Sequence, residues 1–142
     1  MNELQIAMPA LMGGLMTTLK VLVLAIIGGL VLGTVLALMR LSGKPWLAVP
    51  AKLYVNFFRS VPLLLILLWF YFAVPMLYNL ITGTYLTLDT AFTSCVVAFM
   101  VFEAAYFSEV VRAGIQSIGK GQVNAAKALG MTYGQIMRYI VL

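Results

Sequence analysis

Three long apolar segments separated by polar stretches constrain this chain more than any other feature. They run over about 19–39, 61–81 and 90–111. As α-helices rising 1.5 Å per residue, each can cross the ~30 Å hydrocarbon core of a bilayer. Hydrophobic residues make up 63% of the chain and charged residues only 9%, which is too little charge to cover the surface of a soluble domain. The sequence therefore predicts an all-α membrane protein with three transmembrane helices.

The basic residues are distributed unevenly between the two ends of these segments. Cytoplasmic loops of membrane proteins are normally the ones rich in Lys and Arg. The loop at 82–89 has no cation, and the N-terminal flank has only Lys20. We therefore expect a periplasmic or extracellular N-terminus and a cytoplasmic C-terminal segment. This topology accounts for the net charge of +5, so nucleic acid is not an expected partner. The other basic residues fall within 40–60 and 112–142, at Arg40, Lys44, Lys52, Arg59, Arg112, Lys120, Lys127 and Arg138.

The chain contains few of the side chains that catalysis or metal binding requires. It has no histidine and a single cysteine, Cys95, which excludes an ordinary zinc site and a disulfide within the chain. The stretch Gly114–Gly121 resembles a phosphate-binding P-loop, but no Ser or Thr follows Lys120 and no strand precedes it. A membrane enzyme is disfavoured because Glu103 and Glu109 have no histidine or further metal ligand near them. We expect no catalytic residue, metal or cofactor; ATP, if used, binds another chain.

The first apolar segment carries small residues at every fourth position: Ala25, Gly29, Gly33 and Ala37. Such a ridge lets the backbone of another helix approach closely. It could form a homodimer face or pack against another span of the same chain, and the second is favoured in a chain with several spans. Upstream, residues 4–15 repeat leucine and methionine at helical spacing, which predicts an interfacial helix leading into the span.

The third apolar segment contains an ionisable residue, Glu103. A carboxylate at membrane depth is costly and rarely faces lipid, so Glu103 is a candidate functional residue. The alternatives are a structural hydrogen bond inside the bundle or snorkelling toward the nearby surface. Further along, Glu109 and Arg112 stand at i,i+3 and are expected to pair on one helix face. Residues 51–59 are mildly amphipathic and are expected to lie along the cytoplasmic interface.

The segment 119–137 is short of apolar runs and rich in small residues. Its first half is rich in alanine, which favours a helix. Gly130 suits the end of that helix, where a left-handed conformation is needed. Thr132 and Gln135 fit a capping box that begins a second helix. We therefore expect a helix, a glycine turn and a second helix on the cytoplasmic side, followed at 136–142 by the start of a fourth span.

These residues resemble a known family. The run Asn124–Ala126, then Gly130 after three residues and Ile140–Leu142 after nine more, resembles the EAA loop of ABC importer permeases. That pattern reads Glu-Ala-Ala, three residues, Gly, nine residues, Ile, any residue, Leu, Pro. Three further stretches look like the polar amino acid subfamily of these permeases: Gly14–Leu19, Phe58–Leu64 leading to Trp69–Tyr71, and Tyr106–Ile115 followed by Gly121 and Gln122.

The resemblance implies a type I importer permease of five membrane helices, working as a homo- or heterodimer in the bacterial inner membrane. Two cytoplasmic ABC ATPase subunits would drive it, and a periplasmic binding protein would deliver the amino acid. Phe102–Tyr106 looks closest to glutamate/aspartate permeases. The EAA loop would dock on the ATPase and rock the spans between inward-open and outward-open states. Glu103 and Tyr106 would belong to the substrate path. The implied coupling residues are Asn124, Ala125, Ala126, Gly130, Met131 and Thr132.

Two departures from the family pattern affect these expectations. Asn124 stands where the motif has Glu, so it offers a neutral hydrogen bond in place of a charged one; Lys127 and Arg138 are alternative contacts to the ATPase. The chain also stops just before the expected proline, two membrane helices short of five, so we expect a permease truncated after the EAA loop. The alternatives are a small membrane scaffold or assembly subunit, or a non-functional truncated permease.

Overall fold

The computed structural model describes residues 2–84 and 90–141, and every regular element in these ranges is helical. The prediction of an all-α protein is therefore confirmed. Two elements, η1 and η2, are π-helical turns that continue the α-helices before them. In chain order the elements are α1 (Asn2–Leu41), α2 (Pro45–Ser60), α3 (Leu63–Leu68), η1 (Trp69–Ala73), α4 (Val74–Thr82), α5 (Thr90–Ser117), α6 (Lys120–Ala128), α7 (Tyr133–Ile136) and η2 (Met137–Val141).

Three stretches of these helices are long and apolar enough to cross a membrane. They are Ala7–Leu41 in α1, Leu63–Thr82 through α3, η1 and α4, and Ala91–Ser117 in α5. This confirms the prediction of three spans, although the first and third are longer than predicted. The predicted interfacial helix before the first span is not a separate element, because α1 runs unbroken from Asn2 to its end. Pro9 is accommodated within α1, and no second proline follows it in this helix.

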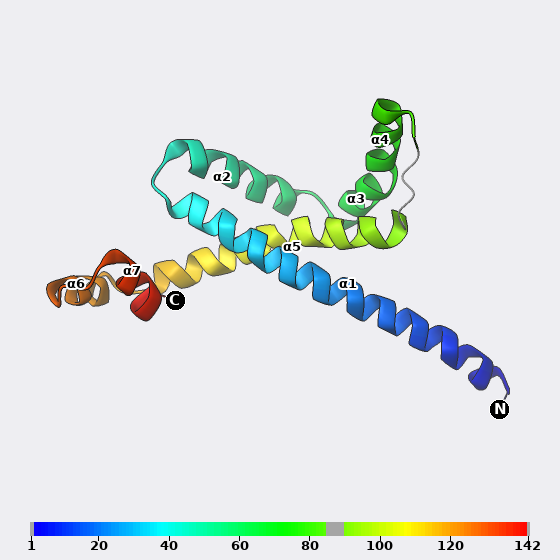
Figure 1. Ribbon diagram of the computed structural model, residues 1–142, viewed down its shortest axis with the longest axis horizontal. Helices are drawn as coiled ribbons and strands as arrows, with labels where there is room; N and C mark the ends of the chain where they lie inside the picture. Colours follow the sequence, from blue (N-terminus) through cyan, green and yellow to red (C-terminus); the bar gives the residue numbers. More distant parts are fainter. Residues whose placement is uncertain (1, 85–89, 142) are drawn as a thin grey trace.

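The main packing contact of the fold is between α1 and α5, which cross at an angle (Figure 1). A Cβ atom added at Gly33 would lie 2.7 Å from Phe107 Cβ and 2.8 Å from the Ala104 carbonyl oxygen. One added at Gly29 would lie 3.2 Å from Glu103 Cβ. Because no side chain stands between the two helices at these glycines, their backbones approach closely, as small residues allow in membrane helices.

Helix α2 turns back from the end of α1 and packs against both α1 and α5 (Figure 1). The turn contains Gly43 at φ +68°, a conformation that suits glycine. Pro45 begins α2, where a missing N–H costs little. The buried core lies where the three helices meet and consists of Leu36, Ala51, Val55, Ala104 and Ala105.

One face of α2 is anchored by Tyr54, whose hydroxyl donates a 2.7 Å hydrogen bond to the Val101 carbonyl on α5. Burial raises the pKa of Tyr54 to about 12, so the hydroxyl stays protonated as a donor. The opposite face of α2 is apolar and exposed. Its residues recur at helical spacing, at Trp46, Val49, Leu53 and Phe57, and this pattern is typical of a helix lying in a membrane interface.

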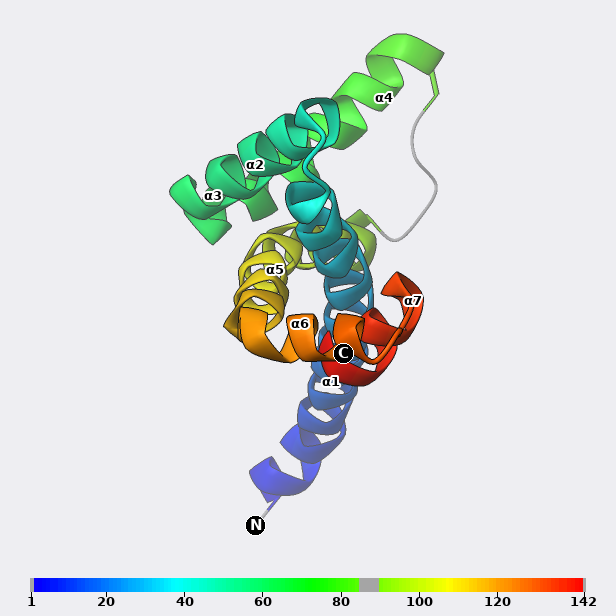
Figure 2. The ribbon, with the colours of Figure 1, turned by 90° about the vertical axis from the view of Figure 1, so that its left-hand side faces the viewer.

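The second span stands apart from α1. Its first half, α3 and η1, contacts α5, whereas α4 extends beyond it (Figures 1 and 2). The π-helical turn Trp69–Ala73 lies directly ahead of Pro75. Pro75 has no backbone N–H to donate and its ring crowds the preceding turn. Widening the helix locally is one way to accommodate such a residue.

Candidate functional site

The C-terminal helices α6 and α7 form a small unit at the end of α5 (Figures 1 and 2). Helix α6 ends in two hydrogen bonds that reverse the chain: Gly130 N–H donates to the Lys127 carbonyl at 2.9 Å, and Met131 N–H donates to the Ala126 carbonyl at 3.1 Å. This pair is the Schellman arrangement, which needs a left-handed residue at its centre. Gly130 supplies it at φ +76°.

Helix α7 begins with the capping box that the sequence predicted. The Gln135 backbone N–H donates to Thr132 Oγ1 at 3.4 Å, and the Thr132 N–H donates to Gln135 Oε1 at 2.8 Å. The two bonds satisfy donors that a helix N-terminus otherwise leaves free. The angle between α6 and α7 is thus held by a glycine turn on one side and a capping box on the other.

The predicted coupling residues divide into an exposed set and a buried residue. Asn124, Ala125 and Thr132 are exposed, and Met131 is half-buried. Ala126 is only 3% exposed. Its small size therefore serves the packing of α6 within the unit, where a larger side chain would separate the helices. Of the two adjacent alanines, only Ala125 is exposed.

Two exposed side chains of this unit were missed by the sequence analysis. Leu129, directly before Gly130, is 82% exposed, and Tyr133, three residues after it, is 77% exposed. Large apolar residues that are exposed outside the candidate membrane spans are typical of contact surfaces. Their signal in the sequence was a large apolar side chain directly before the turn glycine and another within the first turn of the helix that follows.

The structure does not bring Glu103 and Tyr106 into one site. Glu103 lines an open groove of about 630 Å³ between α1 and α5, together with Thr17, Thr18 and Phe99. Its carboxylate forms no hydrogen bond or ion pair with any residue that the structure describes. Tyr106 is not part of that lining; its ring lies 5.7 Å from the Arg59 guanidinium of α2.

A cluster of charged side chains joins α1, α2 and α5. Glu109 Oε1 accepts hydrogen bonds from Arg40 Nη1 at 2.9 Å and Arg59 Nη1 at 3.2 Å. Glu109 Oε2 accepts from Arg112 Nε at 3.0 Å and Nη2 at 2.8 Å. The sequence predicted the Glu109–Arg112 pair, and the structure bears it out. The bonds to Arg40 and Arg59 were not predicted, and they make this one carboxylate the meeting point of three helices.

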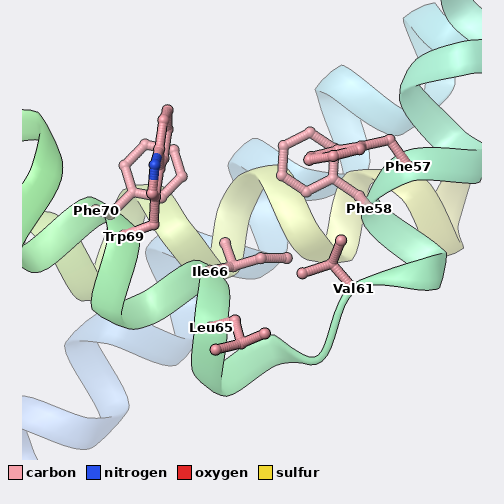
Figure 3. A pocket seen from close by; sticks show the side chains of 7 residues that line it. All are labelled: Phe57, Phe58, Val61, Leu65, Ile66, Trp69 and Phe70. Carbon is pink, nitrogen blue, oxygen red and sulfur yellow. The ribbon is translucent and has the colours of Figure 1, made fainter.

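An apolar pocket of about 200 Å³ lies between α2 and the start of the second span. Phe57, Phe58 and Val61 line it from the α2 side, and the side chains of α3 and η1 face them (Figure 3). Arg59 lies in sequence between these lining residues. All seven lining residues are apolar or aromatic, and Arg59 of the charged cluster is next to Phe58 in the sequence.

Comparisons with known proteins agree on one family. Residues 29–142 match the family described as binding-protein-dependent transport system inner membrane component. The glutamate/aspartate import permease protein GltK of Escherichia coli O6:H1 strain CFT073 is 51% identical over 96% of this chain and 61% of its own length. The arginine transport system permease protein ArtQ of Bacillus subtilis strain 168 is 42% identical over 94% of this chain and 58% of its own length.

A solved structure is also similar. It is described as a crystal structure of an amino acid ABC transporter with histidines, and it shares a TM-score of 0.82 and 34% identity with this chain. The match covers 99% of this chain and 62% of the other. The chain thus spans about three-fifths of the length of the proteins that it matches.

Proposed function

Because the chain belongs to the family of binding-protein-dependent transport system inner membrane components, we propose that it is the membrane-spanning permease part of an ATP-driven importer for polar amino acids. Such a chain is a multi-pass inner membrane protein. Glutamate and aspartate are the favoured substrates, since a permease named for them is 51% identical. The proposed partners are an ABC ATPase that hydrolyses ATP, a periplasmic amino acid-binding protein and a second permease subunit.

The observation that carries this proposal is the helix–turn–helix unit after α5. It presents Asn124, Ala125 and Leu129 on an exposed surface, and its shape is held by Gly130 and the Thr132 capping box. An exposed helix–turn–helix unit of fixed shape is suited to docking into a cleft on an ATPase. Because the unit directly follows α5, a displacement of the unit by the ATPase would also move α5 and the spans packed against it.

The proposed orientation places this unit in the cytoplasm and the N-terminus in the periplasm. Lys120, Lys127 and Arg138 lie in or beside the unit, and Arg40 lies in the last turn of α1. Lys and Arg concentrate on the cytoplasmic side of membrane proteins. In this orientation the ATPase and the coupling surface lie on the same side of the membrane.

Glu103 is proposed to contribute to the substrate path. Its carboxylate lies within a largely apolar groove and has no partner among the described residues. A negative charge there is suited to the α-ammonium group that all amino acids share. Glu103→Gln is expected to lower uptake while leaving the ATPase rate of the complex intact. Normal uptake by that variant would return Glu103 to a structural role.

The coupling proposal is tested in the assembled transporter, reconstituted in liposomes with its ATPase and binding protein. Ala125→Arg places a long charged side chain on the exposed face of α6 and is expected to abolish uptake of labelled glutamate while insertion stays normal. Gly130→Ala forces a side chain into a left-handed conformation, which costs about 1–2 kcal/mol. It should distort the turn between α6 and α7 and lower coupled uptake while insertion stays normal.

The matched control is Gly121→Ala. Gly121 lies in α6, is exposed and has nothing within 4 Å of its added Cβ, without a positive φ. That variant should transport normally. Uptake unaffected by both Ala125→Arg and Gly130→Ala would refute a role in coupling. A complex that forms without any ABC ATPase would instead support the scaffold alternative.

A further inference from the structure

The arginine cluster consists of Arg40, Arg59, Arg112 and Glu109. Its three guanidinium groups carry more positive charge than the single Glu109 carboxylate balances. Arg40, Arg59 and Arg112 converge on the single carboxylate of Glu109, which leaves a formal surplus of two positive charges. Glu103, the preceding acidic residue on α5, is six residues away, or about 9 Å along the helix axis. Partly buried guanidinium groups that share one carboxylate repel each other. The site is therefore electrostatically suited to a further anion.

Donor groups for that anion are present on Arg59. A guanidinium carries five N–H donors, and Arg59 uses only one nitrogen, Nη1, for its bond to Glu109 among the described residues. Its side chain is 45% exposed, whereas that of Arg40 is 13% exposed. Arg59 thus offers unused N–H donors on its exposed guanidinium, and the more buried Arg40 adds positive charge to the same site.

The depth of the cluster matches the level of lipid headgroups. Arg40 is one residue from the end of α1, and Arg59 is four residues before the second span begins at Leu63. Glu109 is nineteen residues along α5 from Thr90, which is about 28 Å, close to the thickness of the hydrocarbon core. All three helices therefore place the cluster at the boundary between the hydrocarbon and the headgroups.

The residues next to Arg59 in the sequence line an apolar pocket. The pocket of about 200 Å³ begins at Phe57, Phe58 and Val61, on both sides of Arg59 in the sequence, and continues to Leu65 and Ile66 (Figure 3). The exposed apolar stripe of α2 lies on the same helix. A phospholipid carries both a phosphate for Arg59 and an acyl chain for the apolar pocket lined by the neighbours of Arg59 in the sequence, whereas a single acidic side chain carries only the anion.

From these observations we propose that the Arg59 edge of the cluster is a binding site for an anionic phospholipid, with the phosphate on the arginines and an acyl chain in the Phe57–Phe70 pocket. The lipid phosphate supplies the missing negative charge by hydrogen bonds to guanidinium, the group best matched to phosphate geometry. This site is separate from the coupling surface and does not depend on which amino acid is transported.

The test measures retained lipid on the purified full chain in mixed micelles of phosphatidylglycerol and phosphatidylcholine by native mass spectrometry. The wild type should retain phosphatidylglycerol in preference. Arg59→Gln should lower this preference about fivefold, because each basic residue at a membrane surface contributes about that factor. Arg59→Lys should keep most of it, since lysine binds phosphate as a point charge. The charge-matched control is Lys127→Gln, which lies on α6 and should leave the preference for phosphatidylglycerol unchanged.

Two further results decide the proposal. Leu65→Trp fills the pocket from an exposed position and should reduce retention of both lipids; unchanged retention would overturn the acyl-chain assignment. Circular dichroism of each variant verifies that its helices remain. An unchanged preference for phosphatidylglycerol in the Arg59→Gln variant would show that Arg59 does not bind the lipid phosphate, and the proposal would be wrong. If that variant keeps its lipid preference but no longer co-purifies with the ATPase, the surplus charge serves a protein partner and the lipid assignment is wrong.

Discussion

The close approach of α1 and α5 makes Gly33→Ala the most informative single change in this fold. An added Cβ would lie 2.7 Å from Phe107 Cβ, 2.8 Å from the Ala104 carbonyl oxygen and 3.0 Å from the Ser108 amide nitrogen. Ordinary contact begins at 3.4 Å. Two of the three neighbours are backbone atoms of α5, so no rotamer change relieves the clash. The helices must separate by about 0.7 Å, because packed interiors have no free space to absorb a methyl group.

The cost of that separation can be estimated. A gap of about 0.5–1 Å forfeits roughly a quarter to a half of each dispersion contact across the crossing. Measured overpacking in well-packed cores costs about 1–3 kcal/mol. Replacing glycine by alanine in a helix also stabilises the helix by about 1 kcal/mol. A second Gly→Ala change in α1, at a position without close neighbours, measures this gain so that it can be subtracted. Relative to such a control, we expect Gly33→Ala to lower the free energy of unfolding by about 2 kcal/mol.

The control is Gly13→Ala, since nothing lies within 4 Å of a Cβ added at Gly13. Both variants are unfolded from detergent micelles by increasing dodecyl sulfate, and the loss of helical circular dichroism gives each midpoint. Gly28→Ala should fall between them, because the three atoms nearest to its added Cβ all belong to the flexible side chain of Met100. Equal midpoints for Gly33→Ala and Gly13→Ala would refute the close packing of α1 on α5.

Two further changes test the remaining contacts between helices in the same unfolding assay. Glu109→Gln leaves three guanidinium groups without their counter-charge and should destabilise the fold by about 2 kcal/mol; an unchanged midpoint would show that the cluster does not join the helices. Tyr54→Phe removes the hydrogen bond to Val101 and should cost about 1 kcal/mol at neutral pH. Because burial raises the pKa of Tyr54 to about 12, its contribution is complete below pH 10 and declines as the pH rises from 10 to 12. The phenylalanine variant should lack that decline, and identical alkaline profiles would contradict the burial of this hydroxyl.

Local features of the structure could be predicted from the sequence because their causes are local. Hydropathy over about twenty residues identifies a span wherever it occurs, so three spans were predicted correctly. The Thr132–Gln135 capping box depends on residues three apart, and Gly130 on its own backbone conformation. The four-residue spacing of Gly29 and Gly33 indicated a contact ridge, and the structure places both against α5.

Features that depend on the path of the chain could not be predicted in this way. Glu109 is 69 residues from Arg40 and 50 from Arg59, and no periodicity connects them. Only Arg112, three residues away, was within reach of a spacing rule. The burial of Ala126 was missed for the same reason, because it depends on how α7 and η2 fold back on α6.

The contact between Gly33 and Ala104 also sets an order of events while the protein is being made. About 70 residues separate the two positions, and at roughly 5–20 residues per second the ribosome needs roughly 4–14 s to reach the second after the first. During this interval α1 is already made, and its glycine ridge has no α5 to cover it. Two nascent copies held near one another would present the same ridge to each other. Retention of the first span at the insertion machinery until α5 emerges would therefore protect assembly, and slowing translation between residues 42 and 90 should increase mispairing between copies.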